Sequence, residues 1–468
     1  MQHRTEDDQQ RVFTILSIAI TAALGGFLFG YDTAVINGAV SAIEATFQTS
    51  PSQLGLTVSS ALLGSAAGAL GAGWLADRFG RRPSMLLAAV LFVLSAVGSA
   101  LAPQLVDLVV WRVMGGVAVG FASVLAPAYI AEISPAAMRG RTGSLQQLAI
   151  VLGIFISLLF NYLIVLVTSD QEPTSLVGPM AAWRWMLMAE VVPALLYGFL
   201  VWRIPESPRY LVQIGDLDQA KAVIRRTIGE PTQVVIDRIQ ASQGKGGGGS
   251  IRDLFSRRSG LLPIVWTGVL LAIFQQLVGI NVIFYYSSEL WQSVGFSTTE
   301  SLSVTVITAV TNVVTTFLAI ATIDRLGRRP LLLLGSVFIT ISLGLMSWTF
   351  SGAPLVDGMP QLTGVPSLVA LISANVFVFA FGFSWGPVMW VLLGEMFNNR
   401  IRAMALGLSA TVNWLTNFLI SMTFPMLLKS SGPALAYGLY ATAGAISFFF
   451  VLFLVCLLYT SPSPRDSV

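Results

Sequence analysis

The sequence predicts an all-α membrane protein in which twelve helices cross a lipid bilayer, arranged as two halves of six helices each. Hydrophobic residues make up 55% of the 468-residue chain and charged residues only 10%, whereas soluble domains carry about 25% charged residues. Apolar runs of about twenty residues recur along the chain, and each is long enough to cross a hydrocarbon core about 30 Å thick. Two motifs each occur once in the first half of the chain and once in the second, which indicates that the chain consists of two related halves. Soluble enzymes, secreted disulfide-rich scaffolds and disordered proteins are excluded.

Apolar stretches between polar segments position the predicted spans. The first begins at Val12 and is too long for the apolar core of a signal peptide, so we expect it to remain as an uncleaved span. The spans are predicted near residues 12–38, 54–76, 83–103, 106–131, 142–166, 184–204, 261–292, 301–322, 330–351, 366–394, 402–428 and 434–458.

The polar segments between these spans define a domain plan. A tail at 1–11 precedes the first six-helix half at 12–204, and a linker at 205–260 with short helical patterns leads to the second half at 261–458. Residues 456–468 are interpreted as an atypical tail, and a non-native origin for it is a hypothesis.

The distribution of basic residues predicts the orientation in the membrane. If both termini and the central linker are placed on one side, all of the 26 Lys and Arg residues except Arg112, Arg184 and Lys429 fall on that side. Cytoplasmic loops of membrane proteins carry an excess of Lys and Arg. We therefore expect a multi-pass protein of a cell inner membrane with both termini in the cytoplasm.

Two motifs occur at equivalent places in each half. The sequence Asp-Arg-x-Gly-Arg-Arg is found at 77–82 and again at 324–329. A glutamate also precedes an arginine by seven residues in both halves, as the pairs Glu132–Arg139 and Glu395–Arg402. Basic turns that only fix topology would account for the arginines but not for the acids or the repeated spacing. The repeats favour an ionic network, as expected for a transporter built from internal repeats.

Several classes of site are excluded by the scarcity of reactive residues. The chain has one histidine, His3 in the N-terminal tail, and one cysteine, Cys456. One cysteine forms no internal disulfide, and no cluster of Cys and His offers a metal site. The net charge of +3 is small and scattered, which argues against nucleic acid as a partner. We expect no metal, no cofactor and no enzymatic activity.

Four further motifs complete the set: Gly-Tyr-Asp at 30–32, Pro-Glu-Ser-Pro-Arg at 205–209, Gln-Gln-Leu-Val-Gly-Ile-Asn at 275–281 and Trp-Gly-Pro-Val-Met-Trp at 385–390. With the repeated loops, in this order, they resemble the sugar porters of the major facilitator superfamily. The resemblance covers nearly the whole chain and is greatest to bacterial proton-coupled hexose and xylose carriers. It implies the major facilitator fold and a monomer that takes up a monosaccharide, such as D-glucose or a related hexose, by alternating access, with the proton as coupling ion.

A sugar site needs amides that donate and accept hydrogen bonds and an aromatic platform for the sugar ring. The span at 261–292 supplies Gln275, Gln276, Asn281 and Tyr285, and Gly279 is expected to loosen the helix between them. The alternative is that these amides only join neighbouring helices. Candidates in other spans are Gln147, Asn312, Asn413 and Trp414. The resemblance implies sugar contact for Gln147, Gln275, Gln276, Asn281, Asn312, Trp390 and Asn413.

Intramembrane charges are costly unless they are paired or functional. Asp32 lies late in the first span and Arg112 lies within the fourth. The resemblance implies that they pair and that Asp32 carries the proton, because facilitative relatives commonly have Asn at that position. A permanent structural salt bridge is the alternative. Glu190 in the sixth span is a second intramembrane acid that we expect to assist proton coupling.

The repeated charged loops are predicted to form a cytoplasmic gate. Single exposed ion pairs contribute little, but a network biases a two-state equilibrium by a few kcal/mol, which is enough to shift it. The predicted gate residues are Asp77, Arg78, Arg81, Glu132, Arg139, Glu206, Asp324, Arg325, Arg328, Glu395 and Arg402.

Two alternatives to a proton symporter stay open. One is a facilitative sugar uniporter. The other, of a different class, is a membrane sugar sensor that does not transport.

Overall fold

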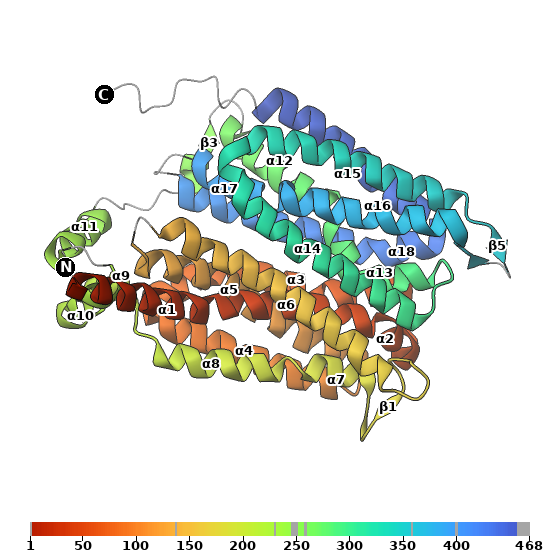
Figure 1. Cartoon of the computed structure of the whole chain (residues 1–468), viewed down its shortest axis with the longest axis horizontal. Coiled ribbons are helices and arrows are strands. Elements are labelled where there is room, and N and C mark those ends of the chain that lie inside the picture. The colour runs from red at the N-terminus through yellow and green to blue at the C-terminus, as the bar shows by residue number, and fades with distance from the viewer. Residues whose placement is uncertain are drawn as a thin grey trace. The chain divides into compact units, whose positions relative to one another are not determined.

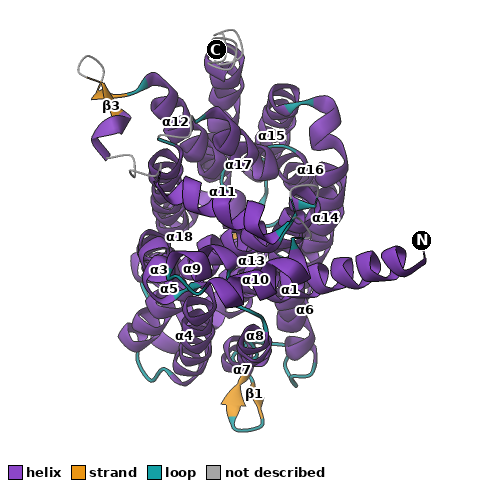
Figure 2. Cartoon of the chain, turned by 90° about the vertical axis from the view of Figure 1, so that its left-hand side faces the viewer, coloured by secondary structure: helices purple, strands orange, loops and turns teal. Residues whose placement is uncertain are grey.

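The computed structural model describes residues 2–135, 138–228, 231–244, 251–256, 260–356, 359–397 and 401–455. Regular structure in these ranges is almost entirely helical, and the strands form three antiparallel pairs of two residues each, which lie in connecting loops (Figure 2). The strands pair as β1 (Leu176–Val177) with β2 (Met180–Ala181), β3 (Phe255–Ser256) with β4 (Gly260–Leu261), and β5 (Leu355–Val356) with β6 (Met359–Pro360).

The helices follow the order of the predicted spans (Figure 1). The first half contains α1 (Gln2–Val35), η1 (Ile36–Ala39), α2 (Val40–Phe47), α3 (Pro51–Phe79), α4 (Arg81–Leu101), α5 (Leu105–Ile133), α6 (Arg139–Leu166), α7 (Ala182–Met188) and α8 (Val191–Arg203). The linker contains α9 (Pro208–Gln213), α10 (Leu217–Thr227), α11 (Thr232–Gly244) and η2 (Ile251–Leu254). The second half contains α12 (Pro263–Leu277), α13 (Ile280–Gln292), α14 (Thr298–Leu326), α15 (Arg328–Ser351), α16 (Gly364–Phe383), α17 (Trp385–Met396), α18 (Arg402–Phe450) and η3 (Val451–Val455).

The described residues contain 11 helical stretches that are long and apolar enough to cross a membrane. The last, Met404–Val455, has 52 residues, which at 1.5 Å per residue is about 78 Å and too long for one crossing. Gly432 interrupts it with non-helical dihedral angles (φ 74°, ψ 172°), so this stretch makes two crossings. The prediction of an all-α membrane protein with twelve spans is confirmed.

Three spans are broken near their middle, and each break has a local cause. Between α7 and α8, Pro193 lacks the N–H that would bond the carbonyl of Ala189. Between α12 and α13, Gly279 adopts the left-handed conformation (φ 79°, ψ 23°) that glycine tolerates best. The expectation that Gly279 loosens its helix is confirmed. Between α16 and α17, Ser384 is non-helical. Pro387, three residues later, lacks the N–H that a continuous helix would use for a backbone hydrogen bond.

The chain forms two compact units. Unit 1 contains residues 1–35, 60–157 and 184–248, and unit 2 contains residues 36–59, 158–183 and 249–468. Helices α1, α4, α5 and α8 pack together in unit 1, whereas α15, α16 and α18 form the most extensive packing in unit 2.

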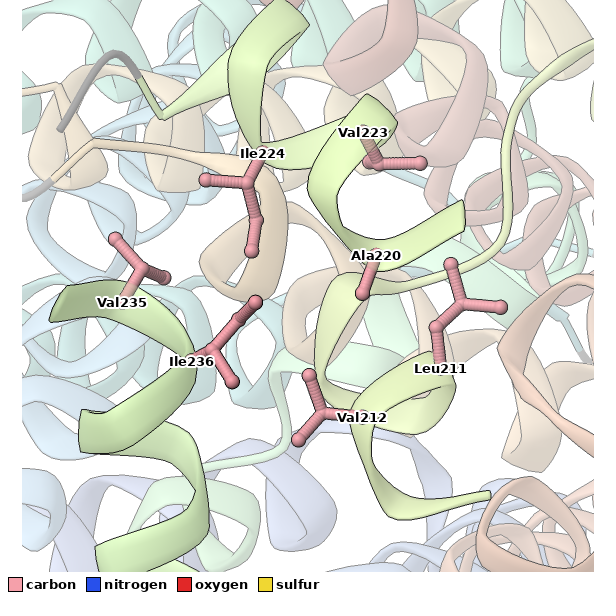
Figure 3. Packing of buried hydrophobic residues seen from close by; sticks show 7 residues of the cluster. All are labelled: Leu211, Val212, Ala220, Val223, Ile224, Val235 and Ile236. Carbon is pink, nitrogen blue, oxygen red and sulfur yellow. The ribbon is translucent and has the colours of Figure 1, made fainter. Parts of the chain in front are cut away.

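The linker helices of unit 1 have a small apolar core of their own (Figure 3). One face of α10 is apolar and packs against α9 and α11. The core residues are Leu211, Val212, Ala220, Val223, Ile224, Val235 and Ile236.

Glycines allow α3 and α5 to cross at backbone contact in unit 1. A Cβ atom on Gly116 of α5 would overlap the carbonyl oxygen of Ala61 on α3, and one on Gly64 of α3 would overlap the carbonyl oxygen of Val113. Small residues at such spacing let membrane helices approach closely, since van der Waals packing drives their association.

We expect Gly116→Ala to force α3 and α5 apart and to destabilise the protein by about 1–3 kcal/mol, the usual cost of overpacking. The matched control is Gly73→Ala on α3, where an added Cβ meets nothing within 4 Å. Thermal unfolding of both variants in detergent measures the difference. Equal melting temperatures for the two variants would contradict the close crossing.

Candidate functional site

The structure brings Asp32 and Arg112 together inside unit 1. Arg112 Nη1 donates to the Asp32 carboxylate oxygen Oδ1 at 3.2 Å and to the Asp32 carbonyl oxygen at 3.1 Å. Each side chain is only 2–3% exposed. Gly115 of α5 leaves room for both neighbouring helices, because an added Cβ would overlap Ser95 Oγ of α4 and would lie 3.2 Å from Asp32 Oδ1 of α1.

Glu190 is the third member of this buried group. It is 2% exposed and lies at the break between α7 and α8. Its carboxyl group is within hydrogen-bonding reach of the Asp32 carboxyl group. The Asp32 oxygen Oδ2 and the Glu190 oxygen Oε1 are buried and accept no hydrogen bond from a described N–H or O–H.

Two facing carboxyl groups form a hydrogen bond only if one of them holds a proton, because an ionised carboxylate is an acceptor without a donor. The group therefore consists of one permanent positive charge and two acids that can share a proton. Such a pair titrates as a unit. This arrangement can take up and release one proton within the membrane.

A second polar cluster, in unit 2, consists of amides. Gln276 Nε2 donates to Asn413 Oδ1 at 3.0 Å, and Asn413 Nδ2 donates to Gln275 Oε1 at 2.7 Å. Gln275 Nε2 donates to the carbonyl oxygens at the start of α17, and Asn281 Nδ2 donates to Gln276 Oε1 at 2.7 Å. The break at Gly279 lets residues of both α12 and α13 take part. The four predicted amides of this unit on α12, α13 and α18 thus form one network.

Within the amide cluster, Asn281 is the member that is only partly buried, while the others are 4–8% exposed. These amides satisfy one another's hydrogen-bonding groups. A network of donors and acceptors that pair mutually can exchange partners with hydroxyl groups of similar strength. This geometry fits both hypotheses, namely that the amides contact a sugar and that they join neighbouring helices.

The other predicted sugar contacts lie on α6, α13, α14, α17 and α18. Asn312 is 9% exposed on α14, where it faces Gly382 of α16. Tyr285 and Trp414 are buried. Trp390 on α17 is 41% exposed. Gln147 lies on α6 in unit 1 and is partly buried.

The Asp-Arg-x-Gly-Arg-Arg loop of unit 1 forms a compact ionic cluster around Arg81. Arg81 donates from Nε and Nη2 to both oxygens of Glu132 at 3.1 Å. Its Nη1 atom donates to the Ala76 carbonyl oxygen and pairs with Asp77. Bidentate arginine–carboxylate pairs are stronger than single contacts. Arg78 instead lies over the rings of Trp74 and Phe79.

Glu206 caps the N-terminus of α4. Its carboxylate accepts the backbone N–H groups of Arg81, Arg82 and Ser207 at 2.7–3.1 Å. Gly80 makes room for it, since a Cβ there would overlap the carboxylate. Burial raises the pKa of Glu206, opposed by these backbone hydrogen bonds and by the Arg81 charge. A carboxylate at a helix N-terminus also offsets the helix dipole.

In unit 2 the equivalent loop places Arg328 against Glu395, with 2.8 Å between Nη2 and Oε1. Gly327 repeats the positive φ of its counterpart in the first loop (81° against 99°). Four predicted gate residues have side chains outside what the structure describes: Arg139, Asp324, Arg325 and Arg402. The predicted tail at 456–468 also lies outside the described residues.

Two polar contacts in unit 2 were not anticipated from the sequence. Asn37, fully buried in η1, donates to Ser287 Oγ at 3.2 Å, and its carbonyl oxygen accepts the hydroxyl of Ser288 at 2.7 Å. Lys429 forms an ion pair with Glu44. Lys429 is one of the three basic residues that the sequence places away from the predicted cytoplasmic side, and this isolation indicated that it has an acidic partner.

Comparisons with known proteins agree with one another. The family model described as "Sugar (and other) transporter" matches residues 18–460. A glucose transport protein of Synechocystis sp. is 57% identical over 441 residues, covering 94% of both chains. A D-xylose-proton symporter of Escherichia coli is 38% identical, covering 93% of this chain and 92% of that protein. The solved structure of the E. coli xylose transporter in a partially occluded inward-open conformation has a TM-score of 0.81 at 35% identity, covering 96% of this chain and all of that one.

We expect Asp32→Ala to destabilise the protein by about 3–5 kcal/mol, because it leaves the Arg112 charge buried without its partner. Asp32→Asn keeps an acceptor oxygen beside Arg112 and should cost clearly less. Thermal unfolding in detergent compares the two variants with the unsubstituted protein. Equal losses in both would argue that the acceptor, and hence the observed contact, does not stabilise Arg112.

Proposed function

Because the chain belongs to the sugar transporter family, we propose that it takes up a monosaccharide, D-glucose or a related hexose, together with a proton. The protein is a multi-pass membrane transporter and not an enzyme. The choice of a hexose is supported by the similarity to a glucose transport protein, and the choice of symport by the similarity to proton symporters for xylose and arabinose.

The observation that carries the proposal is the buried group of Asp32, Arg112 and Glu190. The transport cycle of a uniporter does not require two acids that share a proton. Placing such ionisable groups within the membrane costs free energy. A structural salt bridge would need only one acid for one base. The second acid, Glu190, is therefore the argument for coupling.

In the proposed cycle, a proton from the outside joins the acid pair while the sugar site is accessible from outside. Protonation weakens the attraction of Asp32 for Arg112 and favours sugar binding and closure. On the cytoplasmic side the sugar leaves, the proton follows, and the restored pair between Asp32 and Arg112 favours return. Each unit of pH gradient adds about 1.4 kcal/mol to uptake, and each 100 mV of membrane potential adds about 2.3 kcal/mol per charge moved.

The amide cluster on α12, α13 and α18 is the proposed sugar contact in unit 2, with Asn281 as its most accessible member. We also assign sugar contact to Gln147, Tyr285, Asn312, Trp390 and Trp414. Trp390 suits an aromatic platform because the residue is exposed and not packed in the core.

From the distribution of basic residues we assign the ionic clusters around Arg81 and Arg328, the linker and both termini to the cytoplasmic side. In the proposed cycle they stabilise the helix ends on that side and bias the balance between inward-facing and outward-facing states. The protein is proposed to act as a monomer in a bacterial inner membrane.

We expect Gln276→Ala and Trp390→Ala each to weaken sugar binding by about ten- to a hundredfold, or about 1–3 kcal/mol, because sugar hydroxyls or the sugar ring lose a partner. Calorimetric titration with D-glucose and D-xylose measures this. The matched control is Asn375→Ala, an intramembrane amide of the same unit that bonds Thr311 and the Leu371 carbonyl outside the cluster. Unchanged affinity in both site variants would remove these residues from the site.

We expect Asp32→Asn to uncouple transport, because it imitates the permanently protonated acid. In proteoliposomes the variant should exchange labelled sugar across the membrane and fail to accumulate it against a gradient when an inward pH gradient is imposed. Full pH-driven accumulation by the variant would transfer the proton-carrying role to Glu190. An unsubstituted protein that exchanges sugar and ignores the pH gradient would instead establish the uniporter, and one that binds sugar without exchanging it would establish the sensor.

A further inference from the structure

Tyr197 of α8 is a buried tyrosine to which neither the fold nor the proposed cycle assigns a task. Its side chain is 0% exposed. Its hydroxyl oxygen has no hydrogen-bond partner among the described residues. Buried tyrosine hydroxyls usually find a partner, and leaving one without costs about 1–3 kcal/mol. Phenylalanine would fill the same space without this cost, so the hydroxyl calls for an explanation.

The hydroxyl points at the backbone of α1. A Cβ atom on Gly25 would lie 3.0 Å from the Tyr197 oxygen and 3.3 Å from Cζ, and it would lie 3.4 Å from Ala122 Cβ of α5. The Tyr197 hydroxyl therefore lies against α1 at Gly25, and the missing side chain of this glycine leaves the hydroxyl its room.

The register of the two helices relates this hydroxyl to the buried acids. Gly25 precedes Asp32 by seven residues on α1, and Tyr197 follows Glu190 by seven on α8. Seven residues are close to two helical turns, or about 10.5 Å along the axis. The acids and the hydroxyl thus lie on the same line of contact between α1 and α8, which pack against each other.

Side-chain direction shortens the distance between them. Side chains on a helix lean towards its N-terminus. Asp32 therefore leans along α1 towards the level of Gly25, and Tyr197 leans along α8 towards Glu190.

The charged groups around this line are few. Arg112 faces the acids from α5. Helix α4 packs on α8 and carries charged residues only in its first turn, where Arg82 donates to the carbonyl oxygen of Trp202. No other charged side chain belongs to α8 before Arg203 at its end. Tyr31 of α1 is a second buried tyrosine near the acids, close enough for the Glu190 charge to act on it. On α8 itself, Tyr197 is the first polar side chain after Glu190.

We propose that the Tyr197 hydroxyl relays the proton between the Asp32–Glu190 pair and the cytoplasmic side. In the relay step a protonated water next to the acids gives a proton to the Tyr197 oxygen, forming one O–H bond. The hydroxyl's original O–H bond breaks at the same time and its proton passes to the next water, so that tyrosine ends neutral. The proposal rests on the proposed symport, and Tyr197 acts here as a relay without contact to the sugar.

The test uses Tyr197→Phe in the full-length chain, reconstituted in proteoliposomes. The matched control is Tyr437→Phe, which removes another buried hydroxyl without a described partner, in unit 2. We expect Tyr197→Phe to keep its melting temperature or raise it and to keep sugar exchange within about twofold. The initial rate of pH-driven uptake should fall by about tenfold, which corresponds to about 1.4 kcal/mol in the barrier. The control should keep both rates.

Three outcomes are decisive. If a folded Tyr197→Phe variant keeps both pH-driven uptake and sugar exchange, or loses both, the relay is overturned. Neither of these results argues against symport. If the unsubstituted protein exchanges sugar and ignores the gradient, symport itself fails and the relay with it. If Tyr197→Phe does not fold, Gly25→Ala crowds the hydroxyl without removing it, and it must show the same selective loss of driven uptake for the relay to stand.

Discussion

The positive charge of Arg112 in the interior of unit 1 is the constraint on which much of the structure depends. An arginine cannot be neutralised in proteins, so its burial requires an acid at contact distance. Asp32 meets that requirement with both its carboxylate and its carbonyl oxygen. A side chain at Gly115 of α5 would crowd this contact, because its Cβ would lie 3.2 Å from Asp32 Oδ1. The buried ion pair and the small residues that allow close helix packing therefore go together.

The second acid changes what this pair can do. Glu190 can face Asp32 because the sixth span breaks at Ala189–Glu190, where Pro193 removes a helical hydrogen bond. Broken helices recur at the amide cluster, where Gly279 turns Asn281 back towards Gln276. In both places the interruption of the backbone brings polar side chains together that a continuous helix would distribute around its circumference.

The amide cluster and the ionic clusters differ in the chemical character of their partners. The amides bond one another and backbone carbonyl oxygens, and a ligand with several hydroxyl groups can replace one amide partner with another at little net cost. Arg81 bonds the Glu132 carboxylate and the Ala76 carbonyl oxygen, and Glu206 accepts the N–H groups at the start of α4. These ionic contacts hold the ends of α3 and α4 in place.

The sequence by itself determined the number of crossings, the division into two halves and the intramembrane positions of the charges and amides. These follow from local properties, because the cost of placing a polar group in hydrocarbon depends on the residue itself and on its depth. The break at Gly279 was also predictable from the sequence, because a glycine lies between the amides of this span. Only the tertiary structure decided that Glu190 faces Asp32, that Glu206 caps α4, and that Tyr197 points at Gly25. The tertiary structure also gives the two tryptophans of one motif different environments. Trp385 is buried and donates to Ser336, whereas Trp390 is exposed. Each of these depends on how far a helix is rotated and how closely it crosses its neighbours. Those quantities are set by packing between distant segments of the chain and leave no periodic signal in the sequence of a helix that is apolar on every side.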